Sequence, residues 1–173
     1  MFSLKNRLLD NSQIYSLFTR CLGKKTNIKT PFSIDYKQGD IILDIGCGPA
    51  NILNILPKEI IYYGYDLSEE YIKTAKEIYK GRNAKFEVAS VSEIVLSEEL
   101  IGKVDYVFAI GVIHHIPDEV VKNLFVLAKT ALCKKGKFIS MDNYFCKNQN
   151  FISKFLIAND RGKYVRTEEQ YVD

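Results

Sequence analysis

Two acids and a pair of glycines stand where a chain could bind a nucleoside-bearing ligand. Asp44 precedes the run Gly46-Cys47-Gly48, and Asp66 ends the next apolar run. Glycines in such a loop permit a tight turn and let backbone N–H groups approach a ligand closely. An acid at the end of the following strand commonly accepts hydrogen bonds from ribose hydroxyls. A purely structural glycine turn is the alternative.

Asp44 also restricts the charge of that ligand. The loop reads G-x-G-x-x-N, with Asn51 in place of the third glycine of a dinucleotide loop. A carboxylate at the strand end repels a pyrophosphate but attracts a positive amino or sulfonium group. The pattern therefore favours a cationic nucleoside ligand, and an NAD-dependent oxidoreductase is kept as an alternative.

The two histidines of the chain, His114 and His115, are adjacent. An imidazole titrates near neutral pH, so either ring could remove a proton from a substrate. The alternative is that the pair caps the following helix and packs beneath the ligand. Two neighbouring side chains on a loop rarely hold a metal without a third ligand, so we expect no metal site.

Short apolar runs and helical patterns alternate through the middle of the chain, and this order indicates the fold. We expect a helix from 68 to about 80 and a shorter one near 51–56. A further helix should start at Pro117-Asp118 and close with Lys134-Lys135-Gly136. The pattern predicts a doubly wound, mostly parallel α/β sheet of Rossmann type, with helices on both faces. Its expected strands are 41–45, 60–65, 85–89, 104–110 and 137–141.

Length and composition are those of an ordinary globular protein. The chain has 173 residues and 47% hydrophobic residues, so one domain over 1–173 is expected. Within it we distinguish a helical segment at 1–40, a cofactor-binding core at 41–145 and an incomplete segment at 146–173. The net charge of +3 is too small to indicate binding to nucleic acid or to a membrane.

The spacing of the cysteines indicates the cellular compartment in which we expect the protein. Cys21, Cys47, Cys133 and Cys146 show no C-x-x-C spacing, so we expect reduced thiols and a cytoplasmic protein. The first residues lack the apolar run of a usual secretory signal, so we expect none, and we expect no membrane span because no apolar stretch reaches about 18 residues.

These motifs resemble those of the class I S-adenosylmethionine-dependent methyltransferases of small-molecule type. The first family motif, D-x-G-x-G, is matched by Asp44, Gly46 and Gly48, and the second, G-x-D-x-S, is matched around Asp66. The family often has a third glycine where this chain has Ala50, which a helical φ would accommodate. The resemblance covers roughly residues 36–145.

The resemblance implies a site for S-adenosylmethionine. Asp44 would face the amino group of the cofactor, Asp66 would hold the ribose, and Leu67 would pack on the adenine. Ser90 stands where the family usually has an acid that binds the adenine amino group, and a plain loop residue is the alternative there. The implied cofactor-binding residues are Asp44, Gly46, Cys47, Gly48, Asp66, Leu67, Ser90, Val91 and Ile110.

The histidine pair and its surroundings bear on the methyl acceptor. A His-His pair often occurs at this position in small-molecule methyltransferases, which implies that His114 or His115 lies beside the acceptor. Enzymes that methylate base amino groups commonly carry an N-P-P-Y-like tetrapeptide here, but this chain has Ala109-Ile110-Gly111-Val112. We therefore expect methylation of a small molecule at oxygen or nitrogen, with no nucleic-acid partner and no membrane partner.

Family members usually continue beyond the fifth strand into two further strands. Few residues follow Phe145, so we expect strands six and seven to be missing. A non-catalytic or truncated module of the same fold is thus a second hypothesis. An uncovered fifth strand would also be an edge at which two copies could associate, and we expect a homodimer as one outcome.

Overall fold

The structure, a computed structural model, describes residues 34–147, 149, 151, 154, 157 and 162–172. Residues Asp35–Asp173 form one compact unit. Most of the helical segment expected at 1–40 lies outside the described residues.

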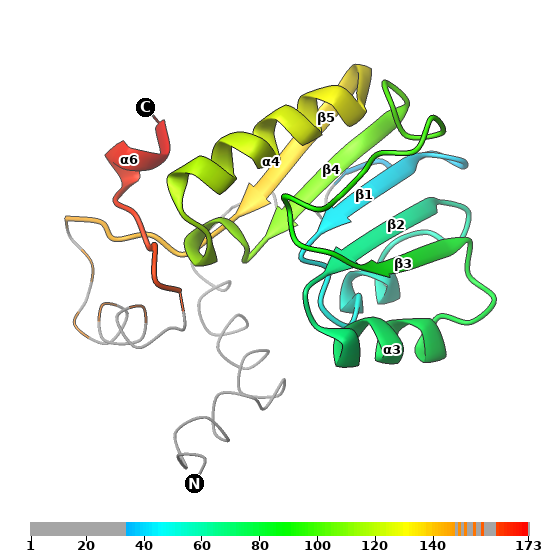
Figure 1. Cartoon of the computed structure of the whole chain (residues 1–173), viewed down its shortest axis with the longest axis horizontal. Helices are drawn as coiled ribbons and strands as arrows, with labels where there is room; N and C mark the ends of the chain where they lie inside the picture. Colours follow the sequence, from blue (N-terminus) through cyan, green and yellow to red (C-terminus); the bar gives the residue numbers. More distant parts are fainter. Residues whose placement is uncertain are drawn as a thin grey trace, which may run out of the picture. The chain divides into compact units, whose positions relative to one another are not determined.

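A five-stranded sheet organises this unit (Figure 1). The strand order is β3-β2-β1-β4-β5, and all four pairings are parallel. The predicted doubly wound sheet is therefore confirmed. Its strands are β1 (Ile41–Ile45), β2 (Ile61–Asp66), β3 (Ala84–Val88), β4 (Val104–Ile110) and β5 (Leu132–Met141).

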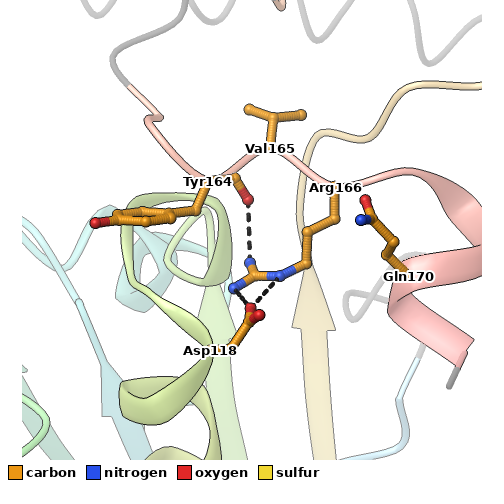
Figure 2. Close-up of a pocket in the computed structure, with 5 residues that line it drawn as sticks. All are labelled: Asp118, Tyr164, Val165, Arg166 and Gln170. Carbon is orange, nitrogen blue, oxygen red and sulfur yellow. Dashed lines mark hydrogen bonds and ion pairs between the residues drawn. The ribbon is translucent and has the colours of Figure 1, made fainter.

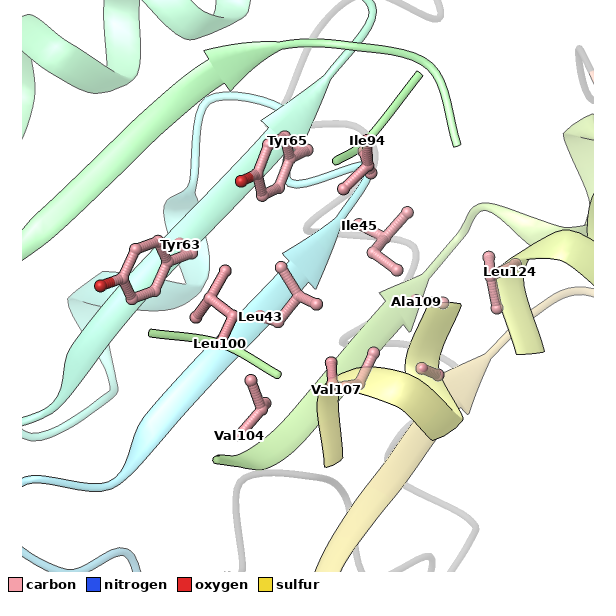
Figure 3. Packing of buried hydrophobic residues seen from close by; sticks show 12 residues of the cluster. Leu43, Ile45, Tyr63, Tyr65, Ile94, Leu100, Val104, Val107, Ala109 and Leu124 are labelled. Carbon is pink, nitrogen blue, oxygen red and sulfur yellow. The ribbon is translucent and has the colours of Figure 1, made fainter. Parts of the chain in front are cut away.

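Successive residues of the central strands point to opposite faces, and each face has its own core. Leu43 and Val107 pack with Leu124 on the face covered by α4 (Asp118–Ala131), which Figure 3 shows from close by. Ile42 and Phe108 pack on the face covered by α3 (Glu69–Ile78). Because both faces of the sheet are covered, the sequences of β1 and β4 are almost continuously apolar.

The helix that follows β2 begins where the sequence predicts. Ser68 is the N-cap of α3, and its Oγ accepts a hydrogen bond from the Tyr71 N–H at 3.2 Å. Glu69 and Glu70 in the first turn add favourable charge at the positive end of the helix dipole. This cap sets the direction of the chain directly after Asp66.

The helix before β5 ends earlier than predicted. α4 ends at Ala131, and β5 starts at Leu132, which pairs with Val104. Gly136 therefore lies inside a strand rather than closing a helix. A Cβ built on Gly136 would lie 2.7 Å from the Val104 carbonyl oxygen, so the glycine permits close approach beside the irregular register of β4 and β5.

The edge strand β5 pairs only with β4 among the described residues, and these residues form no sixth or seventh strand. Beyond it, Phe145 makes an isolated parallel bridge with Thr167, just before the short helix α6 (Glu168–Val172). Three lysines, Lys134, Lys135 and Lys137, lie on β5, and lysine is typical of edge strands that avoid pairing with another chain.

No helix of the described residues is long and apolar enough to cross a bilayer.

Gly64 in β2 provides a test of the packing beneath the glycine loop. A Cβ built there would lie 2.8 Å from Cys47 Sγ and 3.0 Å from ring carbons of Phe86 and Tyr62. We expect Gly64→Ala to lower the free energy of unfolding by about 1–3 kcal/mol through overpacking. Urea denaturation of the purified chain measures this change.

Cys47→Ala provides the matched control, because it removes the nearest atom. The double variant should recover part of the stability that Gly64→Ala loses, relative to Cys47→Ala alone. Equal stability of wild type and Gly64→Ala would show that the strand has room for a side chain.

Candidate cofactor-binding and active site

The predicted site residues lie along the carboxyl edge of the sheet. β1 pairs with β2 on one side and with β4 on the other, so the strand order reverses at β1. In open α/β sheets, ligands bind outside the carboxyl ends of the strands at such a point. Each residue singled out in the sequence lies at the end of a strand or in the segment that follows it, namely Asp44, Gly46, Cys47, Gly48, Asp66, Leu67, Ser90, Val91, Ile110, His114 and His115.

The glycine loop after β1 is pinned to the end of β2. The N–H groups of Gly46 and Cys47 both donate to the Tyr65 carbonyl oxygen, at 2.7 and 3.0 Å. Gly46 has φ 73°, and a Cβ there would clash with the Val112 side chain. Glycine is therefore required at this position both by the backbone conformation and by the close approach of the segment after β4.

Ala50 departs from what the sequence predicts. It has φ 57° and ψ 34°, in the left-handed region, instead of a helical φ. An L-residue other than glycine pays roughly 1–2 kcal/mol for this conformation. The left-handed turn starts the short helix η2 (Asn51–Asn54), whose Leu53 N–H donates to the Ala50 carbonyl at 3.0 Å. The backbone thus needs the conformation that glycine favours, although the chain has alanine there.

Asp66 joins the loop to the start of α3. Its Oδ2 accepts from the Gly48 N–H and its Oδ1 from the Ser68 N–H, both at 2.8 Å. A carboxylate oxygen has more than one acceptor site, so ligand hydroxyls can share this carboxylate. Leu67, the next residue, is 70% exposed, which places an apolar side chain at the rim of the site without a role in the core.

Asp44 is buried, with only 4% of its surface exposed. The Tyr62 hydroxyl donates a hydrogen bond to its Oδ2. The pKa of Asp44 is raised to about 7, chiefly by burial and further by nearby Asp66, while the Tyr62 hydrogen bond acts in the opposite direction. A bound cation would favour the ionised form of this carboxyl group.

Cys47 is not a nucleophile in this environment. Burial, with contributions from Asp44 and Asp66, raises the pKa of its thiol far above the ordinary value. The thiolate is the reactive form of cysteine, so Cys47 stays a neutral thiol. Its contribution to the site is its backbone N–H and its packing against Gly64.

Glu93 is a residue that the sequence analysis missed. Its Oε2 accepts from the Ser90 N–H at 2.9 Å, and hydrogen bonding to Ser90 lowers the pKa of Glu93. The S-x-x-E spacing from Ser90 to Glu93 is that of a capping box, which was the available signal. A carboxylate is therefore present in the loop after β3, where Ser90 itself supplies none.

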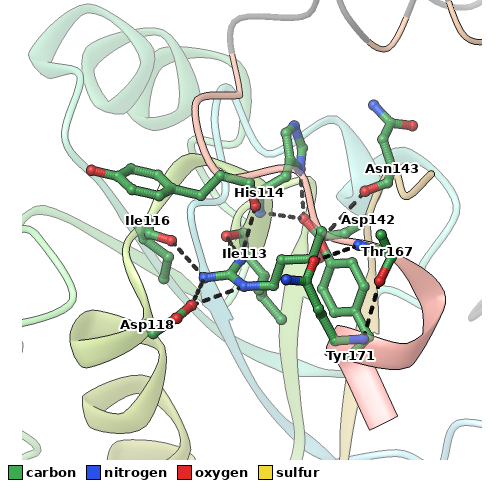
Figure 4. A network of polar contacts seen from close by, with 11 residues as sticks. Ile113, His114, Ile116, Asp118, Asp142, Asn143, Thr167 and Tyr171 are labelled. Atoms are coloured by element: carbon green, nitrogen blue, oxygen red, sulfur yellow. Dashed lines mark hydrogen bonds and ion pairs between the residues drawn. The ribbon is translucent and has the colours of Figure 1, made fainter. Parts of the chain in front are cut away.

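The two histidines have different environments. His114 is buried with 4% exposure, whereas His115 is exposed, and their ring centroids lie 4.1 Å apart. His114 Nδ1 lies 2.6 Å from Oδ1 of Asp142, which directly follows β5 (Figure 4). The sequence analysis missed Asp142, although an acid just after a strand at this edge of the sheet was the signal. The structure therefore distinguishes His114 as the buried histidine, with the Asp142 carboxylate against its Nδ1.

Arg166 ties the C-terminal segment to the histidine loop. Its guanidinium donates to the carbonyls of Ile113 (2.9 Å), Ile116 (3.1 Å) and Tyr164 (3.1 Å). Nε and Nη2 also pair with Asp118 Oδ1, at 3.0 and 2.5 Å (Figure 2). Arg166 lines a surface pocket with Tyr164, Val165 and Gln170. Since its donors are engaged within the chain, Arg166 holds the loop rather than an anionic ligand.

No metal site is formed in the described part of the chain. These residues contain no group of three or more His, Cys, Asp or Glu side chains placed to hold an ion. The described cysteines Cys47, Cys133 and Cys146 are free thiols.

Comparison with known proteins agrees with this geometry. Residues 36–170 match the family described as a methyltransferase domain. The fold is similar to that of the YcgJ protein of Bacillus subtilis, with a TM-score of 0.65 and 16% identity, covering 81% of this chain and 61% of that chain. No curated protein matches the sequence.

Two further solved structures share the fold. Phosphoethanolamine N-methyltransferase 2 of Haemonchus contortus, in complex with S-adenosyl-L-methionine, has a TM-score of 0.66 and 24% identity, covering 84% of this chain and 34% of that chain. A SAM-dependent methyltransferase of Methanosarcina mazei has a TM-score of 0.65 and 17% identity, covering 85% of this chain and 82% of that chain. The chain thus spans only 61% of the Bacillus protein and 34% of the Haemonchus enzyme.

From the burial of Asp44 and its hydrogen bond with Tyr62, we expect the free energy of unfolding to depend on pH. The pKa of Asp44 is about 7 in the folded chain and 3.8 ordinarily, so the folded state binds more protons between these values. Its contribution to stability therefore falls as pH rises from about 4 to about 7. Tyr62→Phe removes the hydrogen bond to the ionised carboxylate, and should cost about 1–3 kcal/mol at pH 8 and less at pH 5.

Urea denaturation at pH 5 and pH 8 measures this difference. Tyr71→Phe is the matched control, because Tyr71 is 43% exposed on α3 and should change stability little at either pH. An equal loss at both pH values in Tyr62→Phe would separate Tyr62 from the ionisation of Asp44.

Proposed function

Because the chain belongs to the family of methyltransferase domains, we propose that it binds S-adenosylmethionine and transfers its methyl group to a small-molecule oxygen or nitrogen acceptor. The observation that carries the proposal is the arrangement at the end of β2. There, Asp66 lies against the glycine loop through Gly48, and the exposed apolar Leu67 follows at once. This arrangement offers one side chain to ribose hydroxyls and the next to an adenine face.

The residues at this edge fit the charge and shape of the cofactor. Asp44 supplies a buried carboxyl group that a nearby cation would ionise. The Gly46 turn lets the backbone approach the methionine portion closely. Leu67 is exposed without a structural need, as expected of a side chain that a bound ring would cover. In this proposal the loop after β3 supplies Ser90, Val91 and Glu93 to the adenine, and Glu93 is held there by its hydrogen bond from the Ser90 N–H.

The chain itself must do little in the reaction. When bound, S-adenosylmethionine supplies a methyl group that its sulfonium charge has already activated. The site must align the acceptor, exclude water and take a proton where the acceptor carries one. His114 is the base in this proposal: it accepts the proton as the new bond to the methyl carbon forms, and the electron pair of the broken C–S bond stays on sulfur.

Two alternatives use the same fold. An NAD-dependent oxidoreductase requires a pyrophosphate near the end of β1, where Asp44 stands, and this carboxyl group disfavours it. A non-catalytic module requires only the cofactor site. The His114–Asp142 pair favours catalysis, since cofactor binding alone does not need a buried histidine paired with an acid.

We further propose a cytoplasmic location, which the free thiols of Cys47, Cys133 and Cys146 support. A homodimer through the β5 edge also remains a proposal, and the lysines on that strand weigh against it. The mild net charge supports a partner other than nucleic acid.

Calorimetry with S-adenosylhomocysteine and with NAD tests the cofactor. We expect binding of the first and no measurable heat with the second. Leu67→Ala should weaken S-adenosylhomocysteine binding by about tenfold through lost apolar contact, and Asp66→Ala should weaken it by about 1–3 kcal/mol through lost hydrogen bonds. Binding of NAD alone would replace the methyltransferase proposal with the oxidoreductase alternative.

Each variant has a matched control. Val95→Ala removes an apolar side chain that is 85% exposed, and Asp40→Ala removes an acid before β1, at the opposite edge of the sheet, whose Oδ2 accepts from the Lys37 N–H. Neither should change affinity. Because Leu67 is exposed, Leu67→Ala should also leave the urea midpoint unchanged, which separates a binding effect from a folding effect.

His114→Asn tests the proposed base, because the asparagine amide can still donate toward Asp142 while the second ring nitrogen is lost. Release of S-adenosylhomocysteine is followed with a panel of small hydroxy and amino acceptors. For any acceptor that the wild type methylates, we expect a rate about 10²–10⁴-fold lower, with unchanged cofactor affinity. His115→Asn is the control and should retain most of the rate. Full activity in His114→Asn would remove His114 from the reaction.

A further inference from the structure

Asp142 holds His114 at two points with a single oxygen atom. Its Oδ1 lies 2.6 Å from His114 Nδ1 and also accepts the His114 backbone N–H at 3.1 Å (Figure 4). The side chains are only 5% and 4% exposed. The two contacts fix both the start of the η3 turn (Ile113–His115) and the orientation of its buried ring.

The other carboxylate oxygen of Asp142, Oδ2, makes no hydrogen bond that would stabilise the fold among the described residues. Asp142 Oδ2 is buried without a hydrogen-bond partner among them. Capping the backbone N–H needs only a neutral acceptor, such as an amide or hydroxyl oxygen, and a buried carboxylate costs more to desolvate. The charge of Asp142 is therefore explained by a partner that can become positive, and His114 is the titratable group bonded to it.

The chemistry of this contact determines which ring nitrogen is basic. An ionised carboxylate only accepts hydrogen bonds, so the 2.6 Å contact requires a hydrogen on His114 Nδ1. In a neutral ring, Nε2 then carries the lone pair. The ring's Cε1 lies 3.9 Å from a Cβ built on Gly111, at the end of β4, and Cδ2 packs against Gly162. Nε2 is bonded to both of these carbons, so it lies near the carboxyl end of β4.

The surrounding backbone holds this orientation. Arg166 binds the carbonyls of Ile113 and Ile116, on either side of the histidine pair. The Tyr164 N–H donates to the His114 carbonyl at 3.0 Å. The loop that carries His114 is therefore restrained on both sides by the C-terminal segment.

We propose that Asp142 is the positioning residue for His114, keeping it in the Nδ1–H form so that Nε2 takes the proton of the methyl acceptor. The inference rests on the proposed function. In the step, the acceptor's O–H or N–H bond breaks and an Nε2–H bond forms. Asp142 stays ionised and stabilises the positive ring. This role is distinct from capping the loop, which uses only the backbone N–H.

Nuclear magnetic resonance of the chain labelled with ¹⁵N-histidine tests the proposal without any acceptor. The chain has only two histidines, and His114→Asn identifies the resonances of His114. In the wild type we expect His114 in the Nδ1–H form, with a low-field Nδ1–H proton. Finding it in the Nε2–H form in the wild type would overturn the proposal by itself, whether or not any variant folds.

Two variants of Asp142 separate positioning from loop structure. Asp142→Asn keeps a carbonyl oxygen for the backbone N–H but removes the charge, so the Nδ1–H resonance should move upfield while the His114 amide stays protected from exchange. Asp142→Ala should lose the Nδ1–H form. An unchanged tautomer in Asp142→Ala, or an unmoved resonance in Asp142→Asn, would contradict the proposal.

Asp105→Asn is the matched control, because Asp105 also accepts a backbone N–H, that of Ile41 at 2.9 Å, but lies at the amino end of β4. It should leave both histidine rings unchanged. Calorimetry with S-adenosylhomocysteine on the same samples distinguishes a failure of the proposed methyltransferase function from a failure of the proposed role of Asp142. Failure to bind would reject the proposed function, whereas the tautomer result concerns only the Asp142–His114 pair.

Discussion

The pairing of β1 with both β2 and β4 is the constraint on which the site depends. The chain passes from β1 to β2 and β3 on one side, and returns to the other side of β1 for β4. The loops after these strands therefore leave the sheet in diverging directions at one edge. The Gly46–Tyr65 hydrogen bond and the close approach of Val112 to Gly46 show how little space separates the loops at this point.

The charges at this edge are arranged for a cation. Asp44 and Asp66 both stand there, and Asp66 contributes to raising the pKa of Asp44. Tyr62 offsets part of the cost of burial by donating to Asp44. Two carboxyl groups close together, one of them buried, form an environment that a positive ligand would stabilise and that an additional negative charge would not.

The histidine side of the candidate site depends on contacts between distant parts of the chain. Asp142 follows β5, and Arg166 comes from the segment before α6, yet both hold the short turn that carries His114. Asp142 caps the turn and orients the His114 ring. Arg166 stabilises the same turn while it pairs with Asp118. The C-terminal residues are therefore part of the site rather than an appendage to the sheet.

The sequence by itself determined the sheet, the glycine loop and the acid after β2, because apolar period, turn chemistry and helix caps are local properties. Ser68 capped its helix as predicted, and the positions of Asp44 and Asp66 followed from strand ends. Local pattern failed where long-range pairing decided the backbone. Pairing of Leu132 with Val104 ended α4 before Gly136, and the path of the loop required a left-handed φ at Ala50.

Only the tertiary structure distinguished His114 from His115, which are identical side chains on adjacent residues. It did so by burying one ring against Asp142 and exposing the other. The same holds for Asp44, whose pKa depends on burial and on Tyr62 in the neighbouring strand. A residue type and its spacing specify which groups are available, but burial and the partner across the sheet decide their charge and orientation.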